Sequence, residues 1–329
     1  MMVMEQPAAK SERLSLLCRA VAATAAVETA EQLGVFAALE TNPAQPPELA
    51  DRLALNERGT VLLLNVLTEL GVLAQDERGV FRSAVPQPAS LKQLLADWRD
   101  LAEALRSDPA RAMRPTVTGA REPRFRFSTL LLAPIAALTA KRLATRLEPM
   151  THQKSCHILT MPGETLWSVA LAERIPGCRI TIWDRHDTLV QSDRTIKAAG
   201  YADRFEYTTD ICQTDPDRAR SAYDLVLGVG LDQIDDLAGH SQVLQQVFRS
   251  LRPGGLLALV EVLAREGSDG PLPLVLYALE LFLRTGQSQV HPFSRYAGWL
   301  HDAGFELLEP YPLSEEPPLT LLTARRPRS

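Results

Sequence analysis

Three acidic residues, Asp184, Asp210 and Glu261, stand at or directly after the ends of apolar segments that have the character of β-strands. A carboxylate at such a place accepts hydrogen bonds from a ligand or caps the helix that follows, and both interpretations stay open for the two aspartates. A carboxylate is costly to bury, so for Glu261 a role in a site is favoured over a structural ion pair. These positions predict a ligand site at the strand ends.

His291 could act as an acid or base, and a solvated loop residue is the equally good alternative. The histidines have no metal-ligand spacing, and the four cysteines form no CxxC pair. We therefore expect no metal and no disulfide framework, and a reducing, cytoplasmic location.

The elements that would position these residues alternate between strands and helices after residue 155. Strand-like segments are 156–159, 179–183, 205–208, 224–229 and 256–261, with helical segments such as 166–174 and 242–251 between them. This alternation predicts a doubly wound parallel sheet of the α/β class, which binds ligands at the carboxyl ends of its strands. Residues 305–309 and 319–323 are expected to add a final antiparallel pair.

The beginning of the chain has a winged-helix pattern. Helical spacing and capping residues predict helices over 14–39, 47–53 and 57–70, with Asn56 as an N-cap and Gly71 at the end, and a hairpin from 72–74 and 80–82. Arg58 is the single basic residue of the helix that would enter a DNA groove, and the net charge is −5. Nucleic-acid binding is therefore disfavoured, and dimerisation is the favoured role.

The segment between these two parts, residues 88–150, is expected to be helical. Its helix over 128–147 is interpreted as the wall of a pocket or as a core packing helix. The predicted domains are thus 1–87, 88–150 and 151–329. No apolar run has the length of a membrane span, and the first residues do not have the character of a signal peptide.

The chain resembles the two-domain small-molecule O-methyltransferases that use S-adenosylmethionine, of the plant phenylpropanoid and bacterial polyketide type. The matching pieces are Glu48-Leu49-Ala50 with 62–73, the turn 250–255, and Ala303-Gly304-Phe305. The resemblance covers roughly residues 14–324. It implies a Rossmann-like methyltransferase domain, an N-terminal winged-helix dimerisation domain, a homodimer through residues 14–85, and a hydrophobic small-molecule substrate.

The family's first turn reads roughly DxGGGxG, and its glycines let the backbone approach the methionine part of the cofactor. That motif falls on residues 159–165, where Gly163 alone is kept and Met161 and Pro162 add bulk. The alternative is a shifted turn that still admits the cofactor, with Glu164 contacting its amino group.

The nucleoside half of the family's site is better retained. By the resemblance, Asp184 matches the acid that binds the ribose, and Asp210 matches the acid beside the adenine amine. S-adenosylmethionine is therefore favoured by one half of the site and disfavoured by the other.

The family's catalytic base is a histidine after the fourth strand, which takes a proton from the substrate hydroxyl. Counting from Asp224 puts this position at Gln233, and matching the acidic residues puts it at Leu231. Neither side chain is a base, whereas the adjacent Asp232 is a weak one. Glu261 matches the family's glutamate that orients the histidine.

Three functions follow. The favoured one is an enzyme of bacterial secondary metabolism that keeps the methyltransferase fold but performs other chemistry, such as cyclisation or a pericyclic reaction, because the glycine-rich turn and the histidine position are lost. Glu261, Asp232 and His291 would supply its polar contacts. The second is an O-methyltransferase with a divergent cofactor site. The third is a non-catalytic dimeric partner subunit, against which the apolar segments 128–147 and 272–283 argue because they predict an open, lined cavity.

Overall fold

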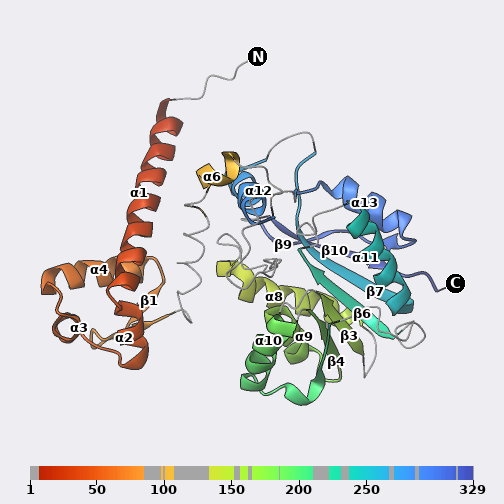
Figure 1. Cartoon of the computed structure of the whole chain (residues 1–329), viewed down its shortest axis with the longest axis horizontal. Coiled ribbons are helices and arrows are strands. Elements are labelled where there is room, and N and C mark those ends of the chain that lie inside the picture. The colour runs from red at the N-terminus through yellow and green to blue at the C-terminus, as the bar shows by residue number, and fades with distance from the viewer. Residues whose placement is uncertain are drawn as a thin grey trace. The chain divides into compact units, whose positions relative to one another are not determined.

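The computed structural model describes residues 7–84, 98, 101–106, 133–151, 156–161, 165–184, 186–209, 222–230, 237–266, 270–285, 289–315 and 318–328. The chain forms two compact units, residues 1–96 and 97–329, and each has its own hydrophobic core (Figure 1). None of the helices in the described ranges is both long enough and apolar enough to cross a membrane.

The described part of the first unit is made of helices and one hairpin. Its elements are α1 Pro7–Gln32, α2 Val35–Thr41, α3 Pro46–Leu53, α4 Glu57–Glu69, β1 Leu73–Gln75 and β2 Phe81–Ser83. The predicted N-cap is confirmed, because the Asn56 side chain accepts the N–H of Gly59 at 2.8 Å. The continuous helix expected over 14–39 is wrong: Gly34, with a φ of 75°, separates α1 from α2.

The second unit is built on an eight-stranded sheet. Its strands are β3 His157–Met161, β4 Arg179–Trp183, β5 Phe205–Thr208, β6 Tyr223–Val229, β7 Leu251–Val262, β8 Glu306–Leu307, β9 Tyr311–Ser314 and β10 Leu319–Arg325. They lie in the order β5-β4-β3-β6-β7-β10-β8, and β9 pairs with β10. The strands from β3 to β7 are parallel, and β10 is antiparallel to β7, β8 and β9. The predicted doubly wound sheet with antiparallel final strands is confirmed.

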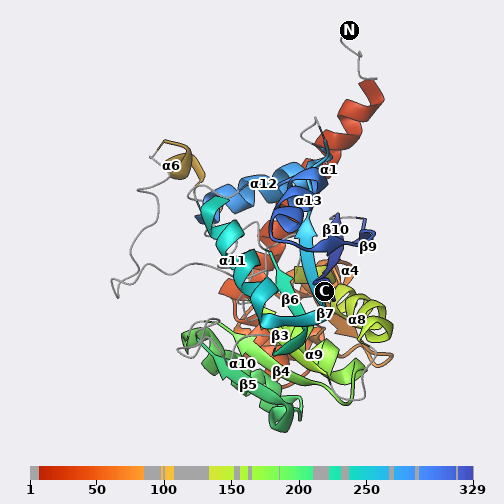
Figure 2. The same cartoon turned by 90° about the vertical axis from the view of Figure 1, so that its right-hand side faces the viewer.

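Helices cover both faces of this sheet. The helices described in this unit are α6 Leu101–Arg106, α8 Ala133–Leu147, α9 Thr165–Arg174, α10 His186–Ala198, α11 Leu237–Ser250, α12 Leu272–Thr285 and α13 Phe293–Asp302, with the short helices η1 Glu148–Met150 and η2 Ala202–Arg204. One core cluster joins the sheet to α8, α9, α10 and α12, and the other joins it to α11 and α13. Figure 1 shows α11 and α13 on one side of the sheet and α8 and α9 on the other, and Figure 2 shows α10 beside the edge strand β5.

Hydroxyl groups fix the start of α9 against its neighbours. The Ser168 hydroxyl donates to the hydroxyl oxygen of Thr160 in β3 at 2.9 Å, and both side chains are buried. The Thr165 hydroxyl donates to that of Ser192 in α10 at 2.7 Å. The helix that follows β3 is therefore held at its first turn by two polar contacts.

Replacing Ser168 with alanine is expected to lower the free energy of unfolding by about 1–3 kcal/mol, because the buried Thr160 hydroxyl loses this partner without gaining water. Denaturant unfolding measures the loss. Adding Thr160→Val removes both hydroxyls and is expected to recover part of it. If the loss of stability in the double variant equals the sum of the losses in the two single variants, the hydroxyls are not coupled, which would contradict this pairing.

His157, the first residue of β3, is a half-buried histidine in a polar setting. Its Nε2 lies 3.1 Å from the hydroxyl oxygen of Thr181, and its backbone N–H donates to the Asp224 carboxylate at 2.8 Å. Its ring packs on Tyr223, with the ring centroids 4.8 Å apart. Burial lowers the pKa of His157 below its ordinary value, although the nearby Glu206 raises it.

This lowered pKa predicts a loss of stability in mild acid. The unfolded chain binds a proton at the ordinary pKa of 6.5, above that of the folded protein, so the free energy of unfolding decreases as pH falls through and below 6.5. Urea unfolding between neutral and acidic pH, compared for His157→Gln and the parent, measures this contribution. The same change at the exposed His301 is the control, and equal slopes in the parent and His157→Gln would exclude the effect.

Candidate functional site

The order of the sheet strands puts the topological switch point of the sheet between β3 and β6. The chain runs from β3 outward to β4 and β5, and then returns to β6 on the other side of β3. Connections diverge at such a switch point, and ligands of doubly wound sheets bind there at the carboxyl ends of the strands. Met161 is in register with Gly228 at this end, and Gly230, with a φ of 70°, follows β6 directly.

The segment predicted as the degenerate cofactor turn begins later than expected. The predicted strand 156–159 is shifted, because β3 runs from His157 through Met161 and pairs on both sides. Leu159 and Met161 are buried in the core shared with α11 and α13. The Met161 Cε would lie 3.8 Å from a Cβ placed on Gly228. The turn itself, with Pro162, Gly163 and Glu164, lies outside the described residues.

Asp184 lies at the carboxyl end of β4, as predicted from the sequence. It is half-buried, and its backbone N–H donates to the carbonyl oxygen of Thr208 at the end of β5, at 3.1 Å. This bond continues the β4–β5 ladder one residue beyond the strand and fixes the backbone of Asp184 near the switch point. Asp210, the second predicted nucleoside residue, lies outside the described residues.

Glu261 is fully buried near the end of β7, and its partner comes from a distant helix. The hydroxyl of Tyr296 in α13 donates to Glu261 Oε2 at 3.1 Å. A hydrogen bond from a buried donor offsets part of the cost of burying a carboxyl group. The sequence reasoning missed Tyr296, and its position on the buried face of a helix gave no separate signal.

His291 lies against the rings of Tyr296 and Trp299 in α13. Its ring centroid is 4.9 Å from that of Trp299 and 6.3 Å from that of Tyr296, both edge-to-face. Its carbonyl oxygen accepts the N–H of Ala264, just beyond β7, at 3.0 Å. The structure therefore brings two predicted site residues, Glu261 and His291, next to Tyr296. Asp232 and Gln233, the other predicted catalytic residues, lie outside the described residues.

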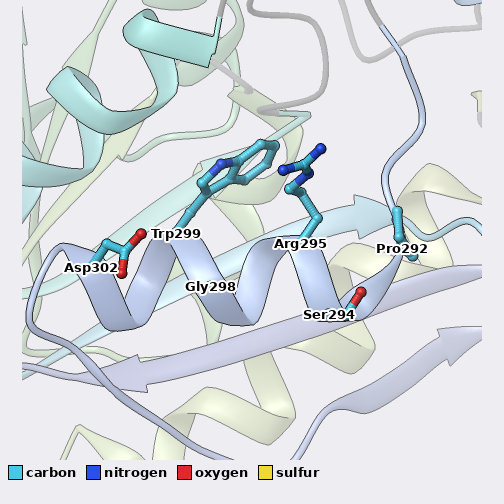
Figure 3. Close-up of a pocket in the computed structure, with 6 residues that line it drawn as sticks. All are labelled: Pro292, Ser294, Arg295, Gly298, Trp299 and Asp302. Atoms are coloured by element: carbon cyan, nitrogen blue, oxygen red, sulfur yellow. The ribbon is translucent and has the colours of Figure 1, made fainter.

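A hollow of about 450 Å³ lies along α13 beside this group. It is lined by Pro292, Ser294, Arg295, Gly298, Trp299 and Asp302 (Figure 3). Figure 3 shows Trp299 and Arg295 projecting from the same side of the helix, with the indole directed toward the guanidinium. Trp299 is thus shared between the hollow and the rings around His291. A flat ring next to a guanidinium suits a planar or anionic group.

Comparison with known proteins defines the relatives of this chain. The family model of the O-methyltransferase dimerisation domain matches residues 15–86. The 3-hydroxy-5-methyl-1-naphthoate 3-O-methyltransferase of Streptomyces sahachiroi is 27% identical over an alignment of length 310, and the match covers 85% of this chain and 84% of that protein. The acetylserotonin O-methyltransferase of Bos taurus is 24% identical over 312 residues, 83% and 86% of the two chains. The chain is a relative of the O-methyltransferases.

Solved structures agree on the fold of this O-methyltransferase relative. Human N-acetylserotonin methyltransferase in complex with SAM matches with a TM-score of 0.67 at 18% identity, over 99% of this chain and 100% of that one. An O-methyltransferase family protein from Burkholderia thailandensis matches with a TM-score of 0.68 at 19% identity, over 98% and 99%. The predicted Rossmann-like α/β fold with an N-terminal helical dimerisation domain is confirmed.

Tyr296→Phe is expected to lower the free energy of unfolding by about 1–3 kcal/mol, because it removes a hydrogen bond to a buried carboxyl group. Thermal or denaturant unfolding measures the change, and Tyr311→Phe on the half-exposed β9 is the control, expected to have little effect. Combining Tyr296→Phe with Glu261→Gln completes a double-mutant cycle, in which a coupling energy of zero would refute the contact.

Proposed function

We propose that this chain is an S-adenosylmethionine-dependent O-methyltransferase of secondary metabolism that acts on a hydrophobic small molecule with an acidic hydroxyl group. The observation that carries the proposal is the relative from Streptomyces sahachiroi, a naphthoate 3-O-methyltransferase that aligns over 85% of the chain. The switch point between β3 and β6 supports it, because such crevices hold nucleotide-like ligands.

The cofactor fits the described residues through its nucleoside half. Asp184 is half-buried at the carboxyl end of β4, where a carboxylate accepts hydrogen bonds from both ribose hydroxyls. Asp210 is proposed beside the adenine amine, and Gly163 and Glu164 beside the methionine part. When bound, the cofactor supplies a methyl group that is activated for transfer to a nucleophile.

The chain's own residues are proposed to promote the reaction more by positioning the substrate than by removing its proton. In the predicted base position the chain has Leu231 or Gln233, neither of which accepts a proton, with Asp232 alongside. An acidic phenol ionises without a strong base, so holding its oxygen in line provides much of the rate. We propose that the substrate pocket takes its polar contacts from the buried Glu261, which is held by Tyr296, and from the nearby His291.

The active form is proposed to be a homodimer through residues 14–85. The matched dimerisation domain supports this, together with large apolar side chains exposed on α1. These are Leu14, Leu16, Leu17 and Val21, each more than half exposed. Exposed apolar side chains of this kind are typical of a surface that a second subunit covers.

A second candidate function is a reaction other than methyl transfer, such as cyclisation or a pericyclic reaction, on the same scaffold. The observation that favours it is the β3 segment, where Leu159 and Met161 stand in place of the family's acid and first glycine. Such an enzyme would hold a reactive substrate in one conformer, with a few hydrogen bonds stabilising the charge that develops.

Calorimetric titration with S-adenosylmethionine and with its demethylated product separates the two functions. Methyl transfer requires binding of both, and Asp184→Ala is then expected to weaken it by about 10–100-fold through the loss of charged hydrogen bonds. Asp203→Ala, at an exposed aspartate in η2, is the matched control and leaves binding unchanged. Absence of binding in the parent protein would overturn the cofactor-dependent function.

Turnover completes the test. Naphthols and related phenols are incubated with the protein, with and without S-adenosylmethionine, and the products are identified by mass spectrometry. A methylated product that needs the cofactor supports the first function, and a rearranged product formed without it supports the second. A protein that neither binds the cofactor nor converts any phenol would leave the non-catalytic partner subunit as the remaining hypothesis.

A further inference from the structure

Two buried thiols lie side by side at the amino-terminal edge of the parallel sheet. Cys156 directly precedes β3 and is 3% exposed, and Cys178 directly precedes β4 and is 1% exposed. The N–H of Arg179 donates to the carbonyl oxygen of Cys156 at 2.8 Å, one residue before the register pair of His157 and Arg179. The two cysteines are therefore lateral neighbours across the β3–β4 pair, and both belong to the same core cluster.

This placement satisfies the geometric requirement for a disulfide. Neighbouring strands lie about 4.8 Å apart, and the Cα atoms of bonded cysteines are usually about 4.4–6.8 Å apart. Side chains of lateral neighbours point to the same face, and each of the two thiols shifts the pKa of the other. Both are free thiols in this structure, so the pair is reduced.

A fixed positive charge lies against one of the two sulfurs. Arg204 Nη2 is 2.9 Å from Cys178 Sγ. The same guanidinium donates to the carbonyl oxygens of Ala172 at 2.9 Å, Ile175 at 2.7 Å and Cys178 at 3.0 Å. It is thus anchored to the end of α9 and to the loop before β4, and it is held beside the thiol.

The hydrogen bond from the Cys156 thiol and the charge of Arg204 lower the pKa of Cys178, against the effect of burial. The same contact and burial raise the pKa of Cys156. The pair is therefore divided into a nucleophile and a proton-bearing partner. A cation next to a thiolate, with a second thiol beside it, is the charge environment found at cysteines that react with oxidants.

We propose that Cys156 and Cys178 form a redox modification site that closes to an intramolecular disulfide with hydrogen peroxide. The Cys178 thiolate attacks one peroxide oxygen, the O–O bond breaks, and hydroxide leaves, which gives a sulfenic acid on Cys178. The sulfur of Cys156 then attacks the Cys178 sulfur, and the S–O bond breaks. The departing hydroxide and the proton of Cys156 form water. Two thiols are oxidised, and one peroxide is reduced to two waters.

This site is separate from the proposed catalytic one. Cys156 and Cys178 precede β3 and β4, whereas Met161 and Asp184 lie at the opposite, carboxyl ends of these strands. Disulfide formation therefore does not depend on whether the chain transfers methyl groups. Its consequence is a covalent link between the two strands that flank α9.

The test uses the full chain with Cys18→Ser and Cys212→Ser, which leaves the two thiols of the pair. After treatment with hydrogen peroxide, we expect the intact mass to fall by two hydrogen atoms and a peptide map to contain Cys156 linked to Cys178. Reduction with dithiothreitol restores the mass. Oxygen added to either sulfur without the linked peptide, or no reaction before unfolding, would overturn the proposal.

Single variants separate the two roles. In the same background, Cys156→Ser is expected to trap a sulfenic acid on Cys178 that dimedone labels, whereas Cys178→Ser is expected to lose the reaction. Equal labelling of both variants would refute the assigned nucleophile. If the background variant does not fold, judged by circular dichroism, the wild-type chain is oxidised and mapped instead. A linked Cys156–Cys178 peptide then supports the proposal, and its absence overturns it.

Discussion

The adjacency of β3 and β6 is the constraint on which the second unit depends. These strands are distant in sequence. The chain first adds β4 and β5 on one side of β3, and the pairing of β6 with β3 begins the other side of the sheet. β6 is also packed closely against β7, because a Cβ on Gly228 would come within 2.9 Å of the Leu259 side chain. A glycine near the carboxyl end of β6 therefore lets β7 and Met161 lie close, next to the switch point.

The polar interior beside this seam is unusual for a core. Glu261 is surrounded by sheet and helix, yet it remains a carboxyl group with a tyrosine hydroxyl as its donor. Packing alone would favour an apolar residue there, because a buried polar pair rarely adds more stability than a hydrophobic one of the same volume. The rings of His291 and Trp299 extend the polar group toward the hollow along α13. Neither Leu231 nor Gln233 is a base, so the proposed methyl transfer would depend on the position of the substrate more than on proton removal.

Much of the fold could be predicted from the sequence, because its signals are local. Strand–helix alternation, the Asn56 cap and the final antiparallel strands all follow from patterns within a few residues of one another. Apolar periodicity runs through Gly34 without a break, so the end of α1 escaped prediction. An apolar run does not distinguish strand from turn either, and β3 extends to Met161 because it has partners on both sides. The partners of Glu261 and Cys178 come from elements far along the chain, a kind of information that one sequence does not carry.

The strand order also has a consequence for the way this protein is made. β10 is the last strand in the sequence, yet it lies inside the sheet, between β7 and β8. During synthesis the ribosome releases β7 well before β10, so one edge of β7 stays open until residues 319–325 emerge. Open strand edges invite pairing with other chains. The nascent protein thus passes through a vulnerable stage that ends only when its final strand inserts.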